Sequence, residues 1–207
     1  MKNFFLAVLI FISVVPSLIA EPFGFGIKGG IGFTNVGGDA FSPIGQNSQL
    51  GLSGGVFGDI GLSQAFSLQP EISIIGKGYS VAGVVTTSAG SPALGPKVNF
   101  SSNLTYLEIP LLLRVHGSLG PAVIINFVAG PYSAFLLNAT DTAGTNSYDA
   151  TSYRNSMDFG LIFGTGLEIG SFLLDLRYEF GFGPVGKYET QGEQNSALSL
   201  LVGFRLF

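Results

Sequence analysis

The sequence contains no cysteine and has little charge for its length. Without cysteine there are no disulfide scaffolds, thiolate metal sites, cysteine nucleophiles or the lipid-modified cysteine of a bacterial lipoprotein. Charged residues make up 11% of the 207 residues and hydrophobic residues 46%, whereas a soluble domain carries about 25% charged residues. Such a chain is too apolar to be disordered and too poor in charge for an ordinary soluble surface. We therefore expect a protein in contact with lipid.

The sign of the charge excludes another class of partner. Nine Lys and Arg residues stand against 13 Asp and Glu residues, which gives a net charge of −4. Proteins that bind DNA or RNA use a basic surface against the phosphate backbone. The sequence therefore predicts no nucleic-acid partner.

The first twenty residues are predicted to be a secretory signal peptide. Lys2 is followed by an uncharged apolar run at 4–15 (FFLAVLIFISVV) and by the sequence SLIA at 17–20. This order of a positive start, an apolar core and a small residue at the end is typical of export signals. An uncleaved anchor helix is the alternative, although the run is shorter than the about 20 residues of a membrane span. We expect cleavage after Ala20 and a single domain over residues 21–207.

The mature chain alternates between apolar and polar or small residues with a period of two. In residues 23–34, Phe23, Phe25 and Ile27 begin one face, while glycine, Lys28 and Thr34 occupy the other. A transmembrane strand needs about 9 to 11 residues of this alternation. The same pattern recurs seven times, at 50–62, 68–77, 105–115, 123–136, 157–169, 172–182 and 198–206. The sequence predicts an all-β fold, an eight-stranded antiparallel transmembrane β-barrel in the bacterial outer membrane.

Connections between these segments alternate between long and short. The long ones, at 37–49, 82–101, 137–156 and 183–196, are rich in Asn, Ser, Thr, Gly and Asp. Outer membrane barrels have long outer loops and short periplasmic turns. Because exposed loops are the usual place for binding, we expect any binding function to lie there.

Charged residues within the predicted strands all fall on the inward parity. A Lys or Arg at the lipid midplane costs about 2 to 4 kcal/mol, so charge belongs on the lumen side. Opposite charges inside a barrel can pair with one another. We predict a structural charge network in the lumen made of Lys28, Asp59, Glu71, Lys77, Glu108, Arg114, Asp158, Glu168, Asp175, Arg177, Glu179 and Arg205.

Enzymatic chemistry has weak support in this chain. The single histidine, His116, has no acidic neighbour in sequence and is more simply a structural residue than a catalytic base. The inward carboxylates offer an acid and base pair only in principle, and a salt-bridge network is the simpler interpretation. Glycine-rich runs at 24–32 and 160–166 lie within strands, unlike nucleotide-binding loops. We expect no enzyme, no cofactor and no metal.

Two functional classes stay open. The first is a non-enzymatic barrel that is structural or binds an envelope protein, a surface protein or lipopolysaccharide through its outer loops. The second is a narrow solute or ion channel, which the small interior of an eight-stranded barrel disfavours. We also expect contact with outer membrane lipid, and with the barrel-assembly machinery during biogenesis. The final aromatic residue, Phe207, partly matches the assembly signal, although its parity is shifted.

Several motifs carry a resemblance to a known family. The more specific ones are QPE at 69–71 and YLEIP at 106–110. Further matching segments lie at 25–33, 54–63, 66–71, 104–114, 129–132, 164–168 and 176–181. With these, the chain resembles the PorT-type outer membrane β-barrel domain family of Gram-negative bacteria. The resemblance implies an eight-stranded barrel, and most members of that family have no assigned activity.

Overall fold

A computed structural model describes residues 23–37, 48–86, 94–187 and 194–207. The predicted signal peptide at 1–20 lies outside these residues. Among the described residues, no helix is long and apolar enough to cross a membrane.

The described chain consists almost entirely of β-strands. In order, these are β1 (Phe23–Gly37), β2 (Gln49–Gly61), β3 (Phe66–Thr86), β4 (Leu94–Ser118), β5 (Val123–Ala143), β6 (Asn146–Asp149), β7 (Met157–Ile169), β8 (Phe172–Gly181) and β9 (Gln194–Arg205). A short 3-10 helix, η2 (Thr151–Tyr153), lies between β6 and β7.

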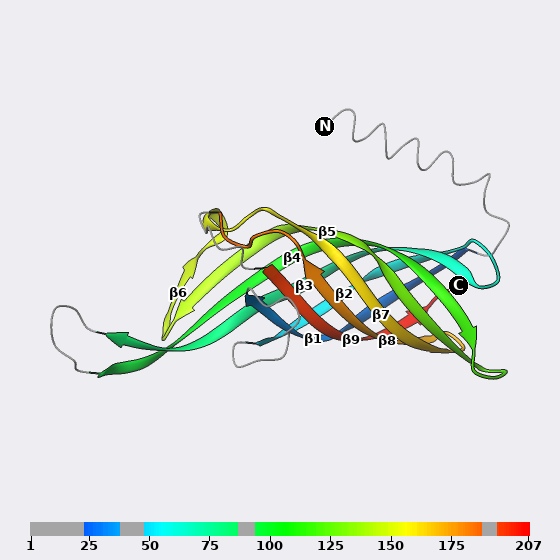
Figure 1. Ribbon diagram of the computed structural model, residues 1–207, viewed down its shortest axis with the longest axis horizontal. Helices are drawn as coiled ribbons and strands as arrows, with labels where there is room; N and C mark the ends of the chain where they lie inside the picture. The colour runs from blue at the N-terminus through cyan, green and yellow to red at the C-terminus, as the bar shows by residue number, and fades with distance from the viewer. Residues whose placement is uncertain (1–22, 38–47, 87–93, 188–193) are drawn as a thin grey trace, which may run out of the picture.

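Eight of these strands close into a ring. Each strand pairs antiparallel with its neighbours in the order β1, β2, β3, β4, β5, β7, β8 and β9. The ring closes where β9 pairs with β1, with Gly26 opposite Arg205 and Gly37 opposite Gln194. Figure 1 shows the resulting barrel, with its strands tilted across one another. The predicted eight-stranded antiparallel barrel is confirmed.

Two of the predicted outer loops are largely strand. Residues 82–101 were expected to form a loop, but β3 continues to Thr86 and β4 begins at Leu94, with these two residues paired. In 137–156, β5 continues to Ala143 and pairs with β6. Figure 1 shows β3 and β4 reaching far beyond the other strands, with β6 on the same side of the barrel. The ninth strand, β6, therefore belongs to this extension and not to the ring.

These segments were predicted to be loops because they lie in water and not in the bilayer. Beyond the bilayer an outward residue has no need to be apolar, so the strict alternation disappears although the backbone pairing continues. Residues such as Asn138, Thr140 and Thr142 are polar and still lie in a paired strand. Strands predicted from lipid-facing alternation therefore end at the edge of the membrane, although the paired backbone continues.

The two faces of the barrel wall differ as expected. On the outside, large apolar side chains are exposed, for example Leu52 at 69% and Val202 at 57%. On the inside, Phe57, Tyr106 and Leu112 are almost fully buried and share the lumen with charged residues. Because the lumen of a small barrel is filled by side chains, the core of this protein is the inside of the ring.

Inward glycines allow the strands to approach closely. A Cβ placed on Gly160 would lie 1.9 Å from the backbone oxygen of Phe180, and one on Gly30 would lie 2.0 Å from that of Leu200. Neither position has room for a side chain. Glycine inside a strand commonly marks such a close backbone approach.

Candidate functional site

The structure brings the twelve predicted lumen residues together in three clusters. Eleven of them are buried, and the side chain of Arg205 is 28% exposed. We name the clusters by position: the periplasmic cluster (Asp59, Arg114, Glu168, Arg205), the central cluster (Lys28, Glu71, Asp175, Arg177) and the Lys77 cluster (Lys77, Glu108, Asp158, Glu179). The first lies at the end with the short turns, which in outer membrane barrels faces the periplasm.

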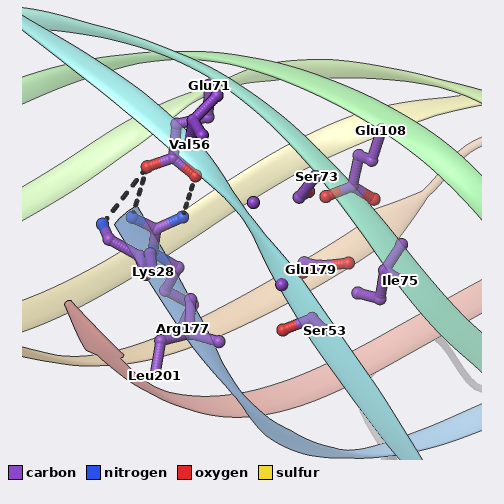
Figure 2. A pocket seen from close by; sticks show the side chains of 12 residues that line it. Lys28, Ser53, Val56, Glu71, Ser73, Ile75, Glu108, Arg177, Glu179 and Leu201 are labelled. Atoms are coloured by element: carbon purple, nitrogen blue, oxygen red, sulfur yellow. Dashed lines mark hydrogen bonds and ion pairs between the residues drawn. The ribbon is translucent and has the colours of Figure 1, made fainter. Parts of the chain in front are cut away.

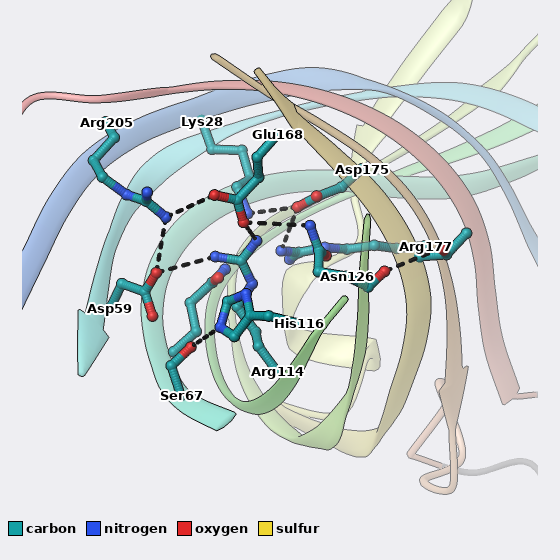
Figure 3. A network of polar contacts seen from close by, with 12 residues as sticks. Lys28, Asp59, Ser67, Arg114, His116, Asn126, Glu168, Asp175, Arg177 and Arg205 are labelled. Carbon is teal, nitrogen blue, oxygen red and sulfur yellow. Dashed lines mark hydrogen bonds and ion pairs between the residues drawn. The ribbon is translucent and has the colours of Figure 1, made fainter. Parts of the chain in front are cut away.

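The periplasmic cluster is organised by two arginines (Figure 3). The fully buried Arg114 donates from Nη1 to Asp59 Oδ2 at 3.1 Å and from Nη2 to Glu168 Oε1. Arg205 Nη2 lies 2.9 Å from Asp59 Oδ2 and 3.0 Å from Glu168 Oε2. Both carboxylates therefore lie between two guanidinium groups, and the cluster is electrically balanced.

The central cluster is also balanced. Arg177 binds Glu71 in a bidentate manner, with Nη1 to Oε2 at 2.8 Å and Nη2 to Oε1 at 2.7 Å. Lys28 Nζ lies 2.6 Å from Asp175 Oδ2 and 3.3 Å from Glu71 Oε1. Its ammonium also lies 4.8 Å from the centre of the Phe57 ring. Two cations and two carboxylates thus satisfy one another in the middle of the lumen.

The Lys77 cluster has a different composition. The ammonium of Lys77 lies 2.9 Å from Glu108 Oε2, 3.1 Å from Glu179 Oε2 and 3.7 Å from Asp158 Oδ2. Asp158 Oδ2 also accepts hydrogen bonds from the Tyr132 hydroxyl and from the amide of Asn195. Three carboxylates therefore share a single cation.

A fourth ion pair, which was not predicted from the sequence, lies at the outer end. Arg154 donates from Nη2 to Asp141 Oδ2 at 3.0 Å and to the Ser102 hydroxyl at 3.2 Å. Burial alone would lower the pKa of Arg154, but the hydrogen bond and charge of Asp141, with Tyr79, raise it above its ordinary value. Arg154 and Asp141 fall in the stretch that was expected to be a loop, so parity gave no signal for them.

The lumen contains little free space. The cavity between the central cluster and the Lys77 cluster has a volume of about 20 Å³ and is lined by side chains including Lys28, Glu71, Glu108 and Glu179. Figure 2 shows these charged groups extending across the interior from different strands. A void of this size holds about one water molecule. The charged layers therefore fill the barrel as a plug.

His116 has a partner that its sequence neighbours did not reveal. Its Nε2 atom lies 2.8 Å from the hydroxyl oxygen of Ser67, beside the periplasmic cluster (Figure 3). Within the described residues, no carboxylate forms a hydrogen bond with His116, so the orienting acid of a catalytic triad is absent there. The same part of the chain contains no group of three His, Cys, Asp or Glu side chains arranged to hold a metal ion.

Within the described residues, the outer extension has a backbone edge without a strand partner. We define the outer sheet as the parts of β3, β4 and β5 beyond the ring, together with β6. Pairing between β2 and β3 reaches only from Gly61 opposite Ser67 to Ser53 opposite Ile75, with an isolated bridge between Ser48 and Tyr79. Residues 80–86 of β3 pair with β4 on one side. On the other side they have no strand partner among the described residues.

Comparison with known proteins gives the family. The model of the outer membrane protein beta-barrel domain matches residues 17–186. No curated protein sequence matches the chain.

Solved structures of small barrels are similar in architecture. Ail, the attachment invasion locus protein of Yersinia pestis, aligns over 90% of this chain and 100% of its own, with 12% identity and a TM-score of 0.41. Neisserial surface protein A aligns over 89% and 99%, with 14% identity and a TM-score of 0.49. The N-terminal barrel of Pseudomonas aeruginosa OprF aligns over 88% and 97%, with 14% identity and a TM-score of 0.37. By its closed barrel and its match to the family model, this chain belongs to the outer membrane protein beta-barrel domain family and is a protein of the bacterial outer membrane.

Proposed function

We propose that this protein is a non-enzymatic barrel that binds a partner outside the cell through the free edge of its outer sheet. The observation that carries the proposal is the side of β3 at residues 80–86 that has no strand partner in the described part of the chain. An exposed strand edge offers a row of backbone donors and acceptors to an extended segment of another chain.

The sequence of this edge supports the proposal. Soluble proteins protect free edges with lysine, proline or other charged residues, because an unprotected edge recruits further strands. No charged residue occurs between Lys77 and Lys97, and no proline occurs in β3 beyond Pro70. The pairing of β3 with β4 has a register shift between Val84 and Thr86. The edge is therefore suited to accept a strand along most of its length.

The plugged lumen favours binding over conduction. Ion-paired side chains cross the interior at three levels, and the cavity between two of them has a volume of about 20 Å³. Aqueous pores belong to barrels with more strands. A solute or ion channel is accordingly the weaker of the two functions.

Strand addition also favours one kind of partner. Backbone pairing requires an extended polypeptide, so the partner is an envelope protein or a surface protein with an extended segment. Lipopolysaccharide and outer membrane lipid would instead contact the apolar outside of the ring, where Leu52 and Val202 are exposed. The barrel-assembly machinery is a further proposed partner, acting during biogenesis.

Amide hydrogen exchange tests the proposal directly. We expect the backbone amides of residues 80–86 that point away from β4 to be protected in native outer membrane vesicles and to exchange rapidly in purified protein in detergent. A photo-crosslinker placed at Ser80 should then link this edge to a protein partner in intact cells. The matched control is Ser152, which lies in the outer part of the chain but not on the edge.

A shortened hairpin provides the decisive variant. Ala82 faces Asn99 across the β3 and β4 pair, so residues 83–98 can be replaced by a two-residue Asn-Gly turn without changing the register. This variant should fold normally and lose the crosslinked partner. Equal crosslinking from Ser152, or a partner retained after shortening, would contradict the proposal.

We further infer that this chain belongs to the PorT-type group of outer membrane barrels. The motifs QPE at 69–71 and YLEIP at 106–110 support this inference. Both contain a lumen carboxylate, Glu71 in the central cluster and Glu108 in the Lys77 cluster.

A further inference from the structure

The three lumen clusters differ in their charge balance. The periplasmic and central clusters each contain two cations and two carboxylates. The Lys77 cluster contains one cation and three carboxylates. Lys77, Glu108, Asp158 and Glu179 are all at least 96% buried, with exposed fractions of 3%, 2%, 3% and 4%. The excess negative charge of the three clusters is therefore confined to one group of buried side chains.

Two buried carboxylate groups in this cluster depend on the same cation within the described residues. Glu108 and Glu179 each contact Lys77 through Oε2. Among the described residues, neither Glu108 Oε2 nor Glu179 Oε2 has a hydrogen-bond partner besides this ion pair, whereas Asp158 Oδ2 also accepts from two neutral donors. Glu108 and Glu179 both line the small lumen cavity, together with Ser53 and Ser73 (Figure 2). Two buried carboxyl groups thus face the same water-sized space.

The described residues around the Lys77 cluster provide no further cation to neutralise its excess negative charge. The groups that face the cluster are Tyr106 from β4, Tyr132 from β5, Asn195 from β9, and across the cavity Lys28 from β1 with Arg177 from β8. Both of these cations are already paired with the central carboxylates. They would also repel a metal ion placed in the cavity. A buried carboxylate that lacks a counter-charge becomes neutral by taking up a proton.

We propose that Glu108 and Glu179, with the cavity between them, form a proton-binding site, and that Glu108 carries a proton at neutral pH. A protonated Glu108 donates through the cavity toward Glu179 and halves the uncompensated charge. Because glutamate in the unfolded chain is ionised at neutral pH, the folded barrel binds more protons than the unfolded chain. The free energy of unfolding therefore falls as the pH rises, because its change with pH follows the number of protons bound by the unfolded chain minus the number bound by the folded barrel. This inference concerns the plug and is independent of the outer sheet.

Infrared spectroscopy of the full chain in lipid vesicles tests the proposal. At neutral pH the protein should show the carbonyl stretch of a protonated carboxylic acid. The stretch should be lost in Glu108→Gln and kept in Glu71→Gln, the matched control from the balanced central cluster. Absence of the stretch from the wild-type protein, or its persistence in Glu108→Gln, overturns the proposal.

Stability measurements give a second readout. Glu108→Gln imitates the protonated side chain, so its unfolding midpoint in urea should equal or exceed that of the wild type at neutral pH. The wild-type midpoint should decrease toward alkaline pH, and that of Glu108→Gln should decrease less. Replacing sodium and potassium by choline should change neither midpoint. A midpoint that depends on the alkali cation would mean that a metal ion, and not a proton, occupies the cavity, and would overturn the proposal.

Discussion

Arg177 and Glu71 form the closest bidentate ion pair of the lumen, with two parallel contacts of 2.8 and 2.7 Å between β8 and β3. Planar guanidinium and carboxylate groups match one another in this geometry, which fixes both side chains. The pair joins strands on opposite sides of the ring order, so it acts as a brace across the barrel.

Breaking this brace should strongly destabilise the barrel. In Arg177→Met, Glu71 loses its bidentate partner and Asp175 loses a contact of 3.0 Å. Removing one member of a buried ion pair typically costs about 3 to 5 kcal/mol, because a charge is left buried without compensation. Urea unfolding in lipid vesicles measures the change. Lys187→Met serves as the control, because Lys187 is exposed and donates only to the backbone oxygen of Ser152.

Alanine should destabilise the barrel at an inward glycine and should be tolerated at an outward glycine. In Gly160→Ala the new methyl group would lie 1.9 Å from a backbone oxygen, whereas in Gly54→Ala the nearest atom is 4.0 Å away. Overpacking costs about 1 to 3 kcal/mol or more. On a gel of unboiled protein, the first variant should lose the compact, heat-modifiable band, and the second should keep it. Equal behaviour of the two variants would show that Gly160 has no steric role.

Planar-bilayer recording should show no discrete openings for the wild-type protein. The three charged clusters and the buried Phe57, Tyr106 and Leu112 side chains occupy the described lumen, and the cavity between two of the clusters has a volume of about 20 Å³. Steady unitary currents that disappear in variants of Arg114 or Glu108 would assign conduction to the lumen and reject the plugged barrel.

Arg154 should hold the outer segment after β6 in place. In Arg154→Met, the contacts of 3.0 and 3.2 Å with Asp141 and Ser102 are lost. Because these groups lie outside the ring, the heat-modifiable band should not change. Protease cleavage near η2 in intact cells should increase several-fold, as expected for easier local unfolding. The control is Tyr153→Ala, which removes a side chain that is 64% exposed.

The sequence was most informative where lipid constrains it. Alternation located all eight ring strands, because each outward residue in the bilayer must be apolar, as at Leu52 and Val202. The same rule placed the twelve charged residues on the lumen side. Alternation could not predict which charged residues form ion pairs. Lys77 and Glu179, for example, are brought together by the order and stagger of β3 and β8.

The outer sheet was missed for the opposite reason. Residues 82–86 and 94–101 are paired by backbone hydrogen bonds in water, where side chains need not alternate. Composition rich in small and polar residues is typical of a loop as well as of such a strand. The pair of Ser67 and His116 depends on a contact between β3 and β4 that no local motif encodes.

We expect the seam between β1 and β9 to form late in folding. Its pairs, such as Gly26 with Arg205, join the first and last strands of the described chain. Contacts between such distant residues form late, because closing a long loop is entropically costly. Until β9 arrives, both β1 and β8 expose an unpaired edge. A chain that lacks β9 is therefore expected to remain an open sheet that recruits other strands.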